Sequence, residues 1–326
     1  MKPFKKLTIN DRDIIQRFTM NSERMTADML FANICGWQHL TNMGYAIIED
    51  MLVMRGNMDG SLIYSLPIGR GNLRFVLMQM LEEAENLGMN CRIFGVPENK
   101  IEEIERAMPA HFDFYAEDSN SDYIYRRDSL VTLAGKKLQP KRNHINKFHR
   151  VYPNAQFLEL TEEFIPACKQ LEQSWNQELN EDDSYISKSD ELTFTNFILD
   201  NFRSLGLRGG VLLVDGNVAA FTIGGPINEQ TFDICVEKAD TRYDGAYTAI
   251  NHLFASSLPE QFIYINREED MGIEGLRHAK QSYHPDMLLK KYAAIPRMSF
   301  GQSIFYNNEK MVPPPSNSTY KLKNAQ

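Results

Sequence analysis

The densest group of polar side chains follows a predicted strand near the end of the chain. The strand is expected over residues 262–266, and the side chains at and after its end are Asn266, Arg267, Glu268 and Asp270. Open α/β sheets bind ligands beyond the carboxyl ends of their strands. Long polar loops at such places are also enriched in functional residues. This run therefore marks a candidate site.

A predicted helix over residues 273–281 carries two cations on one face. Arg277 and Lys280 are three residues apart, a spacing that makes them neighbours on a helix. Beside Glu268 and Asp270 they could hold an acyl donor and position an amine, with Tyr283 as a further binding residue. A surface helix with salt bridges, each contributing little, is the alternative.

A second cluster is strongly basic. The segment 128–150 opposes its cations with one acid, Asp128, and the cations are Lys136, Lys137, Lys141, Arg142, Lys147 and Arg150. In a chain of net charge -8 this local excess could meet phosphates, which guanidinium groups bind in a bidentate manner. Lys141, Arg142 and Asn143 are therefore candidates for binding RNA or a phospholipid headgroup. A solvated helix face is the plainer interpretation.

The loop before a predicted helix at 246–257 partly matches a pyrophosphate-binding loop. Acyl-CoA-dependent acetyltransferases hold the diphosphate with backbone N–H groups at a helix N-terminus. Arg242 and Gly245 fit that pattern. Tyr247 stands where a small residue is needed, and Asp240 and Asp244 would repel a diphosphate. The match to an acyl-CoA site is partial.

Other chemistries find little support in the sequence. It has no Gly-x-Ser-x-Gly motif of a serine hydrolase, and its seven histidines lack metal-ligand spacing. We expect no metal and no cofactor besides the acyl donor. Trp175, on a predicted helix, is either a core anchor or the wall of a substrate site. Four scattered cysteines suit free thiols in a reducing compartment.

Length and composition predict an ordinary globular protein of two domains. The chain has 326 residues, of which 43% are hydrophobic and 24% charged. Its N-terminus lacks the apolar stretch of a signal peptide, and no window approaches the roughly 20 apolar residues of a spanning helix. We therefore expect a cytoplasmic protein without a transmembrane segment.

The predicted elements repeat in two halves. In the first half, strands at 45–53 and 61–68 flank a turn, and a helix at 72–87, a strand at 91–96, a helix at 98–108 and a final strand follow. In the second half, helices at 164–177 and 192–205 precede strands at 211–214, 218–223 and 231–236. The helix at 246–257, the strand at 262–266, the helix at 273–281 and a last strand at 288–294 complete it.

This order is that of an acetyltransferase-type fold, in which two neighbouring strands splay apart and admit the substrate. We therefore predict an α/β (α+β) protein with two tandem domains, each a mixed, mostly antiparallel sheet flanked by helices. The domains are expected at residues 1–150 and 151–311, with the candidate site in the second. The proline-rich segment 312–326 is expected to be a surface tail.

Several motifs together resemble a known bacterial family. They are Glu237-Lys238-Ala239, the run Asn266–Gly272, the run Gly275–Pro285, and Lys141-Arg142-Asn143. Over nearly its whole length the chain resembles the family grouped with the C-terminal domain of lysyl-phosphatidylglycerol synthase. The resemblance implies a tandem acetyltransferase-like fold, related in architecture to the Fem-type peptidyltransferases. It also implies aminoacyl transfer from aminoacyl-tRNA to a lipid or peptidoglycan-precursor acceptor, with the chemistry in the C-terminal half.

Carried over residue by residue, the resemblance assigns roles to the first cluster. Arg277 and Lys280, with Asp270, would meet the aminoacyl end and terminal adenosine of the donor. Glu237 and Glu268 would act as bases or orienting groups. The long membrane domain of the lipid enzyme has no counterpart in this sequence, so the expected acceptor is an amine or hydroxyl of an unidentified small molecule, lipid or peptide.

Two alternatives stay open at this point. The first is an acyl-CoA-dependent N-acyltransferase. The second is a non-catalytic module that binds RNA or another anionic ligand through its basic segment.

Overall fold

The chain divides into two compact units, each built from segments that lie apart in the sequence. The computed structural model describes residues 3–58, 60–116, 118–178 and 187–297. Unit 1 comprises Met1–Leu7, Leu40–Asn120 and Lys290–Gln326, and unit 2 comprises Thr8–His39 and Ser121–Leu289. The expected tail at 312–326 lies outside the described residues.

Unit 1 is a mixed sheet in the order β1-β2-β3-β4-β6-β15-β7, with β5 paired to β3. Its strands are β1 (Lys5–Lys6), β2 (Gly44–Ile48), β3 (Met51–Met58), β4 (Ser61–Ser65), β5 (Ile68–Gly69), β6 (Asn90–Pro97), β7 (Phe112–Ala116) and β15 (Lys291–Pro296). The helices α4 (Leu73–Leu87) and α5 (Ile101–Ala107) pack on it through Val76, Met80 and Ile104. Asn72 caps α4 by accepting from the Phe75 N–H at 3.1 Å.

Unit 2 is a sheet in the order β14-β8-β13-β12-β11-β10-β9. Its strands are β8 (Asp122–Arg126), β9 (Gln156–Glu159), β10 (Arg208–Val214), β11 (Asn217–Pro226), β12 (Thr231–Ala239), β13 (Tyr264–Asn266) and β14 (Met287–Leu289). Its helices are α1 (Arg12–Thr19), α2 (Phe31–Gly36), α6 (Arg127–Thr132), α7 (Gln139–Val151), α8 (Ile165–Glu178), α9 (Lys188–Asp200), α10 (Ala246–Ser257) and α11 (Glu274–Gln281). The helix α3 (Gln38–Thr41) spans the sequence boundary between the units, and short 3-10 turns lie at Ile9–Asp11, Ala27–Met29, Glu98–Lys100, Asp118–Asn120 and Glu162–Phe164.

The two sheets follow the same plan. Each has one parallel pair in its middle, β4 with β6 in unit 1 and β12 with β13 in unit 2. In each, the strand next to that pair comes from a distant part of the chain: β15 lies between β6 and β7, and β8 lies between β13 and β14. The halves therefore exchange one strand at equivalent positions, and unit 2 also includes the helical segment Thr8–His39.

The exchange of strands and the placement of residues 8–39 together make the division differ from the expected domains 1–150 and 151–311. The segments 8–39 and 121–150 belong to unit 2, although they precede residue 151. The strand expected at 288–294 is two strands, of which β14 pairs with β8 and β15 with β6 and β7. Which sheet a strand joins depends on tertiary packing, and local patterns carry no signal for it.

One predicted strand in the first half was wrong. Residues 45–53 form a hairpin of β2 and β3, with Ile48 opposite Met51. The two turn residues, Glu49 and Asp50, have φ of 48° and 57°. Asn and Gly are the usual residues at such positions, so nothing in the sequence signalled this turn. The hairpin predicted at Asp215-Gly216 is confirmed, with φ of 49° and 80°.

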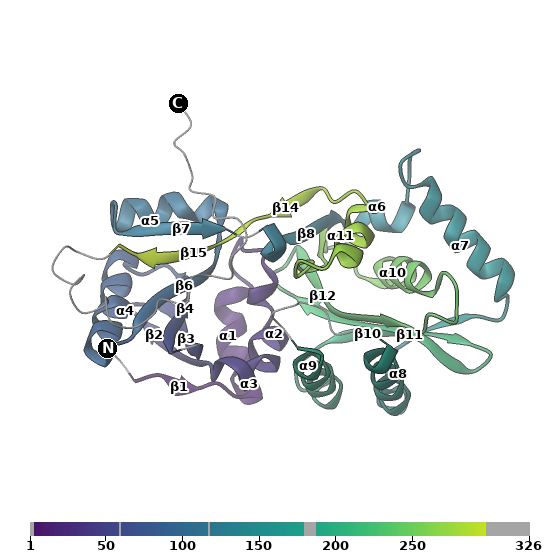
Figure 1. Ribbon diagram of the computed structural model, residues 1–326, viewed down its shortest axis with the longest axis horizontal. Coiled ribbons are helices and arrows are strands. Elements are labelled where there is room, and N and C mark those ends of the chain that lie inside the picture. Colours follow the sequence, from purple (N-terminus) through teal and green to yellow (C-terminus); the bar gives the residue numbers. More distant parts are fainter. Residues whose placement is uncertain (1–2, 59, 117, 179–186, 298–326) are drawn as a thin grey trace. The chain divides into compact units, whose positions relative to one another are not determined.

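Helices cover both faces of the unit 2 sheet. Figure 1 shows α8 and α9 on one side of β10 and β11 and α10 on the other. The helix α7 buries Phe148 among Ala246, Ala249 and Ile250 of α10. In the described part of the chain, no helix has the length and apolar character needed to cross a bilayer.

Candidate active site

The candidate site lies in unit 2, where β12 and β13 separate. The strands pair over only three residues each, Thr231–Asp233 and Tyr264–Asn266. After Asn266 the chain parts from β12 and stays hydrogen-bonded to Tyr123 of β8 through the backbone of Arg267 and Glu268, whereas β12 continues to Ala239. No described strand pairs with this edge of β12 beyond Asp233. The strand splay expected in the second half is therefore present.

A β-bulge in β12 turns the next side chains toward α10. Val236 is in register with Ile223 and Ile234 with Gly224, which leaves Cys235 as an extra residue. A bulge shifts the alternation of the side chains that follow it. Glu237 therefore meets Asn251 of α10, on the same side of the sheet as the Phe232–Phe254 contact.

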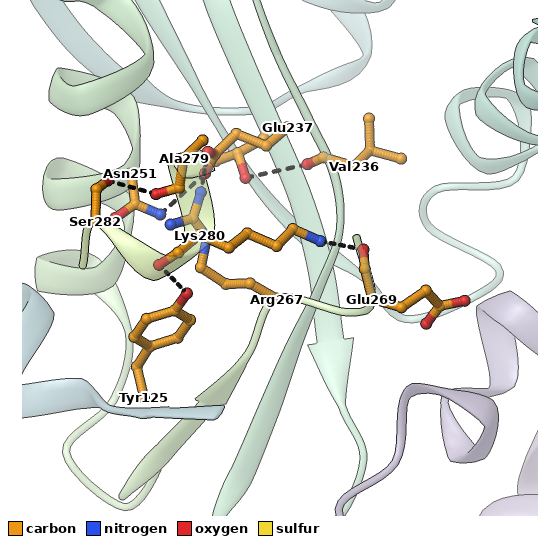
Figure 2. A network of polar contacts seen from close by, with 10 residues as sticks. Tyr125, Val236, Glu237, Asn251, Arg267, Glu269, Ala279, Lys280 and Ser282 are labelled. Carbon is orange, nitrogen blue, oxygen red and sulfur yellow. Dashed lines mark hydrogen bonds and ion pairs between the residues drawn. The ribbon is translucent and has the colours of Figure 1, made fainter. Parts of the chain in front are cut away.

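Glu237 and Arg267 form an ion pair beside the separation point (Figure 2). The Nη2 group of Arg267 donates to Oε1 of Glu237 at 2.8 Å, and Nδ2 of Asn251 donates to Oε2 at 3.1 Å. The Arg267 and Glu237 side chains are only 12% and 11% exposed. Although burial opposes it, the Glu237 carboxylate raises the pKa of Arg267, so the guanidinium stays charged. Its Nη1 group has no hydrogen-bond partner among the described residues.

The ring of Tyr283 lies against two cations. Cζ of Arg267 is 5.0 Å from the ring centroid, and Nζ of Lys141 from α7 is 4.0 Å from it. The buried ring also packs edge-on against Tyr125, with 6.4 Å between centroids. Burial, and to a smaller extent the charge of Arg267, lowers the pKa of Lys141 to about 8. Lys141 therefore reaches the same cluster as Arg267, although it lies far away in sequence.

Lys280 extends from α11 to the loop that follows β13 (Figure 2). Its Nζ donates to the backbone carbonyl of Glu269, and its own carbonyl accepts from the Tyr125 hydroxyl at 2.7 Å. Burial lowers the pKa of Lys280, and the charge of Glu268 opposes this effect. An ammonium has three hydrogens to donate, so one bond to a carbonyl leaves the capacity to bind a further acceptor.

Carboxyl groups from three strand segments meet at the same end of β13. They are Asp122 of β8, Asp233 of β12 and Glu268, which accepts from Nδ2 of Asn33 at 2.7 Å. Burial, and to a smaller extent repulsion from Glu269, raises the pKa of Glu268 to about 8. Burial, and then the charge of Glu268, raises the pKa of Asp233 well above its ordinary value. Burial and like charges at this distance thus favour the protonated forms of Glu268 and Asp233.

Asp270 organises the loop between β13 and α11. Arg277 donates to its two oxygens at 2.9 and 3.1 Å, and the Tyr123 hydroxyl donates to Oδ2 at 2.7 Å. The Gly272 N–H completes the set at 2.9 Å. Burial opposes the effect, but the hydrogen bonds from Arg277 and Tyr123 hold the pKa of Asp270 below its ordinary value. The Arg277 guanidinium is therefore bound to the loop itself.

Comparison with known proteins gives the family. The family model "Phosphatidylglycerol lysyltransferase, C-terminal" matches residues 20–295. This chain belongs to that family. A crystal structure of a conserved protein of unknown function from Bacteroides thetaiotaomicron is 44% identical, covers 91% of this chain and 100% of its own, and has a TM-score of 0.86.

More distant structures share the fold of this lysyltransferase-family chain. L-PGS from Bacillus licheniformis is 16% identical with a TM-score of 0.68, and covers 94% of this chain and 97% of its own. FemX is 8% identical with a TM-score of 0.61, and covers 93% and 98%. The predicted acetyltransferase-like and Fem-like fold is thus confirmed. An uncharacterised protein of Mycoplasmoides gallisepticum is 26% identical over 178 residues, and the match spans only 56% of its length.

Most residues predicted for the site of this family member do lie together. Around the end of β13 are Glu237, Asn266, Arg267, Glu268, Asp270, Arg277, Lys280, Tyr283 and, from α7, Lys141. Asn266 is buried and donates to Asp122 at 2.9 Å and to the Met25 carbonyl at 2.8 Å, so it joins strand to strand.

Other predicted residues lie elsewhere. Arg142 donates to the carbonyls of Leu133 and Gly135, where it closes the end of the loop before α7. Asn143 is exposed on α7. Trp175 falls within α8, but its side chain lies outside the described ones. Among the residues described, no group of histidine, cysteine, aspartate or glutamate has the arrangement of a metal site.

The loop before α10 is closed by its own contacts. Arg242 is 81% exposed and pairs with Asp240, and the Ala246 N–H donates to the Tyr243 carbonyl at 3.0 Å. A side chain at Gly245 would lie 3.3 Å from Cβ of Phe148, because α7 packs over this helix end. The Arg242 and Ala246 N–H groups of this loop are thus already occupied, which counts against an acyl-CoA site.

Several residues of the cluster were missed by sequence reasoning. They are Tyr123, Tyr125, Asn251, Asp233, Asp122 and Asn33. Each stands alone in an apolar or unremarkable stretch. Asp233 carries one usable signal, since a carboxylate within the apolar strand predicted at 231–236 needs a partner or a function.

Proposed function

We propose that this chain transfers an aminoacyl group from aminoacyl-tRNA to an amine or hydroxyl acceptor. One observation carries the proposal: an ammonium, Lys280, and a proton-holding carboxyl, Glu268, converge where β12 and β13 separate. The family description, which names a lysyltransferase, supports the choice of reaction. A cytoplasmic location is part of the proposal, because aminoacyl-tRNA is made there.

The reaction joins the acceptor to the carbonyl carbon of the aminoacyl ester. The nitrogen or oxygen of the acceptor attacks that carbon, and a tetrahedral oxyanion forms. Lys280 and the edge of β12 beyond Asp233 supply donors for the oxyanion. The bond from carbon to the ribose 3′ oxygen then breaks, and the tRNA leaves.

Glu268 moves the proton in this scheme. Its ionised form takes the proton that the acceptor loses, and the resulting acid returns it to the leaving 3′ oxygen. A pKa near the working pH suits a group that must act in both directions. Asn33 fixes the orientation of this carboxyl through its 2.7 Å hydrogen bond.

The pair of Arg267 and Glu237 has a positioning role. It bridges the end of β13 to β12 beyond the bulge, and Asn251 holds the second carboxylate oxygen. Fixed groups of this kind keep two substrates in an attack geometry. The closed loop before α10 favours tRNA over acyl-CoA as the donor.

The decisive experiment measures acceptor-dependent deacylation. The full chain is incubated with a mixture of labelled aminoacyl-tRNAs and fractions of cell lipids and peptides. We expect loss of label from tRNA only when an acceptor fraction is present, with the label appearing in that fraction. The variant Lys280→Met should lose at least about 99% of this rate, because the oxyanion loses a charged donor.

The matched control is Lys169→Met, in the same unit. Lys169 lies on α8 and pairs with Asp200 at 2.6 Å, away from the separation point. It should transfer at the rate of the unaltered chain. Deacylation that ignores the acceptor, or that survives in Lys280→Met, would contradict the proposed function.

A further inference from the structure

Three acidic side chains gather around Asn266 on one face of the unit 2 sheet. Asp233 is the partner of Asn266 in the parallel pair of β12 and β13, and Asp122 of β8 accepts from Nδ2 of Asn266 at 2.9 Å. Glu268 follows two residues later, and its backbone N–H donates to Oδ1 of Asn266 at 2.6 Å. All of these residues belong to unit 2. Asn266 thus lies at the centre of a group of carboxyls.

The carboxyl of Asp233 lacks a hydrogen-bond donor. The residue is fully buried, and no N–H or O–H group of the described residues donates to either oxygen. The charges that it meets most strongly are those of two other acids, Glu268 and Asp122. A buried acceptor without a donor is costly. This position therefore calls for a donor from outside the described part of the chain.

The side chain of Asn33 points into the same group. Its Nδ2 donates to Oε1 of Glu268 at 2.7 Å and to the Ala27 carbonyl at 3.1 Å. Its Oδ1 is buried and receives no hydrogen bond from the residues that the structure describes. This oxygen belongs to a neutral carboxamide. The surplus of acceptors here is therefore more than a crowding of acids.

The unsatisfied atoms of Asp233 and Asn33 are all acceptors, which restricts the ligand. Lys280 adds a positive charge near Glu268, but its ammonium donates to the backbone carbonyl of Glu269. A ligand ammonium offers three hydrogens and accepts none, so it matches the surplus of acceptors. A hydroxyl offers one hydrogen and would leave acceptors unsatisfied.

We infer that Asp233, Glu268 and Asn33 form a subsite for a primary ammonium, and that the acceptor of the transfer reaction is therefore an amine. The inference rests on the proposed function, which leaves the acceptor as an amine or a hydroxyl. Glu268 is partly exposed, whereas Asp233 and Asn33 are buried. An ammonium group thus enters past Glu268 and directs its hydrogens to the acceptors behind.

The subsite suits the nucleophile better than the ammonium of the donor, because only the nucleophile must lose protons. The bound ammonium gives one proton to the Glu268 carboxylate, which passes it to solvent. The neutral nitrogen then attacks the ester carbon. Its second proton goes through Glu268 to the ribose 3′ oxygen as the bond from carbon to that oxygen breaks. The products are an amide and a tRNA with a free 3′ hydroxyl.

The first measurement is binding of a simple amine, which does not depend on transfer. The probe is n-butylammonium chloride, added to the full chain at constant ionic strength while the midpoint of thermal unfolding is recorded. We expect a saturable rise, since a ligand that binds the folded state stabilises it. The controls n-butanol and tetramethylammonium chloride should give no such rise, because the first lacks the charge and the second lacks N–H donors.

Three variants make the result specific. Asp233→Asn keeps the shape of the side chain but removes its charge, so it should weaken n-butylammonium binding by at least about tenfold. Asn33→Leu should also weaken it, and this residue lies in a different segment of the chain. Asp200→Asn, at an exposed pair with Lys169, is the matched control and should bind like the unaltered chain. Circular dichroism of each variant confirms the fold.

The second measurement is the linkage in the labelled product of transfer. An amide keeps its label in mild alkali, whereas an ester loses it, and we expect the label to be kept. Equal binding by Asp233→Asn and Asp200→Asn, or no n-butylammonium binding at all, would overturn the subsite. An ester product would overturn the amine acceptor and point to the ammonium of the donor as the occupant.

The outcomes separate this inference from the proposed function. Binding of n-butylammonium that requires Asp233, in a chain that transfers no aminoacyl group, would uphold the subsite while the proposed reaction fails. Acceptor-dependent deacylation that yields an ester would uphold the reaction while the amine acceptor fails.

Discussion

Arg267 and Glu237 join the end of β13 to the part of β12 beyond its bulge, with 2.8 Å between Nη2 and Oε1. The pair therefore fixes how far the strands part after Asp233 and Asn266. Neither residue could reach the other without the bulge at Cys235, because Glu237 would then point to the opposite face of the sheet.

A double-mutant cycle tests this coupling. Removing one partner leaves the other charge nearly buried and unpaired, so Arg267→Ala and Glu237→Ala should each destabilise the protein by about 3 kcal/mol. The double variant should lose clearly less than the sum of the two. Urea unfolding of the four proteins gives the coupling energy. Additive losses would show that the two side chains act independently.

Glu268 should control the pH dependence of transfer. Its pKa is about 8, and the reaction needs the ionised form, so the rate should rise with pH up to that value. Glu268→Gln should lower the rate by about 100-fold or more and remove this rise. The measurement is a profile of the transfer rate from about pH 6 to about pH 9 at constant ionic strength.

The same carboxyl makes a prediction for stability. The folded state raises the pKa of Glu268 from 4.5 to about 8, so it binds more protons than the unfolded state between these values. The free energy of unfolding must therefore fall as pH rises through that window. Glu268→Gln should show a weaker fall. Identical pH dependence in both proteins would show that Glu268 of the folded protein does not have its pKa raised to this range.

Arg277 should act on the loop rather than on the chemistry. It is 43% exposed, but its two hydrogen bonds reach a carboxylate, Asp270, that is 1% exposed. Arg277→Ala should destabilise the protein by about 1–2 kcal/mol, since Tyr123 and Gly272 still hold Asp270. Urea unfolding checks this value. Unchanged stability with lost transfer would instead put Arg277 in contact with substrate.

Strong local signals made much of the fold predictable. Gly216 permits the turn between β10 and β11, and Gly88 ends α4 at a φ of 64°. The helix expected at 246–257 begins and ends as predicted. The exchange of β8 and β15 was not predictable, because a strand of five or six residues carries no mark of the sheet that it joins.

The candidate site was predictable where its residues follow one strand. Arg267, Glu268 and Lys280 are close in sequence and in space, so their grouping required only the strand at 264–266. Lys141 and Asn33 come from distant segments, and only the folded chain shows that they meet the same cluster. Local charge alone predicts Lys141 as a binding residue, but it does not predict the contact with Tyr283.

Acetyl-CoA should not bind at the loop before α10. The Arg242 N–H donates to Asp240 at 2.9 Å, the Ala246 N–H donates to the Tyr243 carbonyl at 3.0 Å, and the Phe148 side chain lies next to Gly245. Isothermal titration at micromolar protein should therefore give no binding heat. Gly245→Ala would be strained, because φ is 89° at this position. This variant should likewise give no binding heat with acetyl-CoA. Saturable micromolar binding would revive the acyl-CoA alternative.

Lys141 should reduce stability at neutral pH, as expected of a residue kept for function. Burial and the charge of Arg267 lower its pKa from 10.5 to about 8, so the folded state holds its proton less tightly than the unfolded state. Below pH of about 8, stability is reduced by the full effect, and it recovers as pH rises toward the unfolded value. Lys141→Met should therefore raise the midpoint of thermal unfolding at neutral pH, and the gain should shrink steadily in more alkaline buffer.

Lys169→Met, at an exposed pair with Asp200, serves as the control and should show no such trend. If Lys141→Met is less stable than the unaltered chain at neutral pH, the contact between the ammonium and the Tyr283 ring outweighs the cost of burial, and the case for an unsatisfied cation at this position fails.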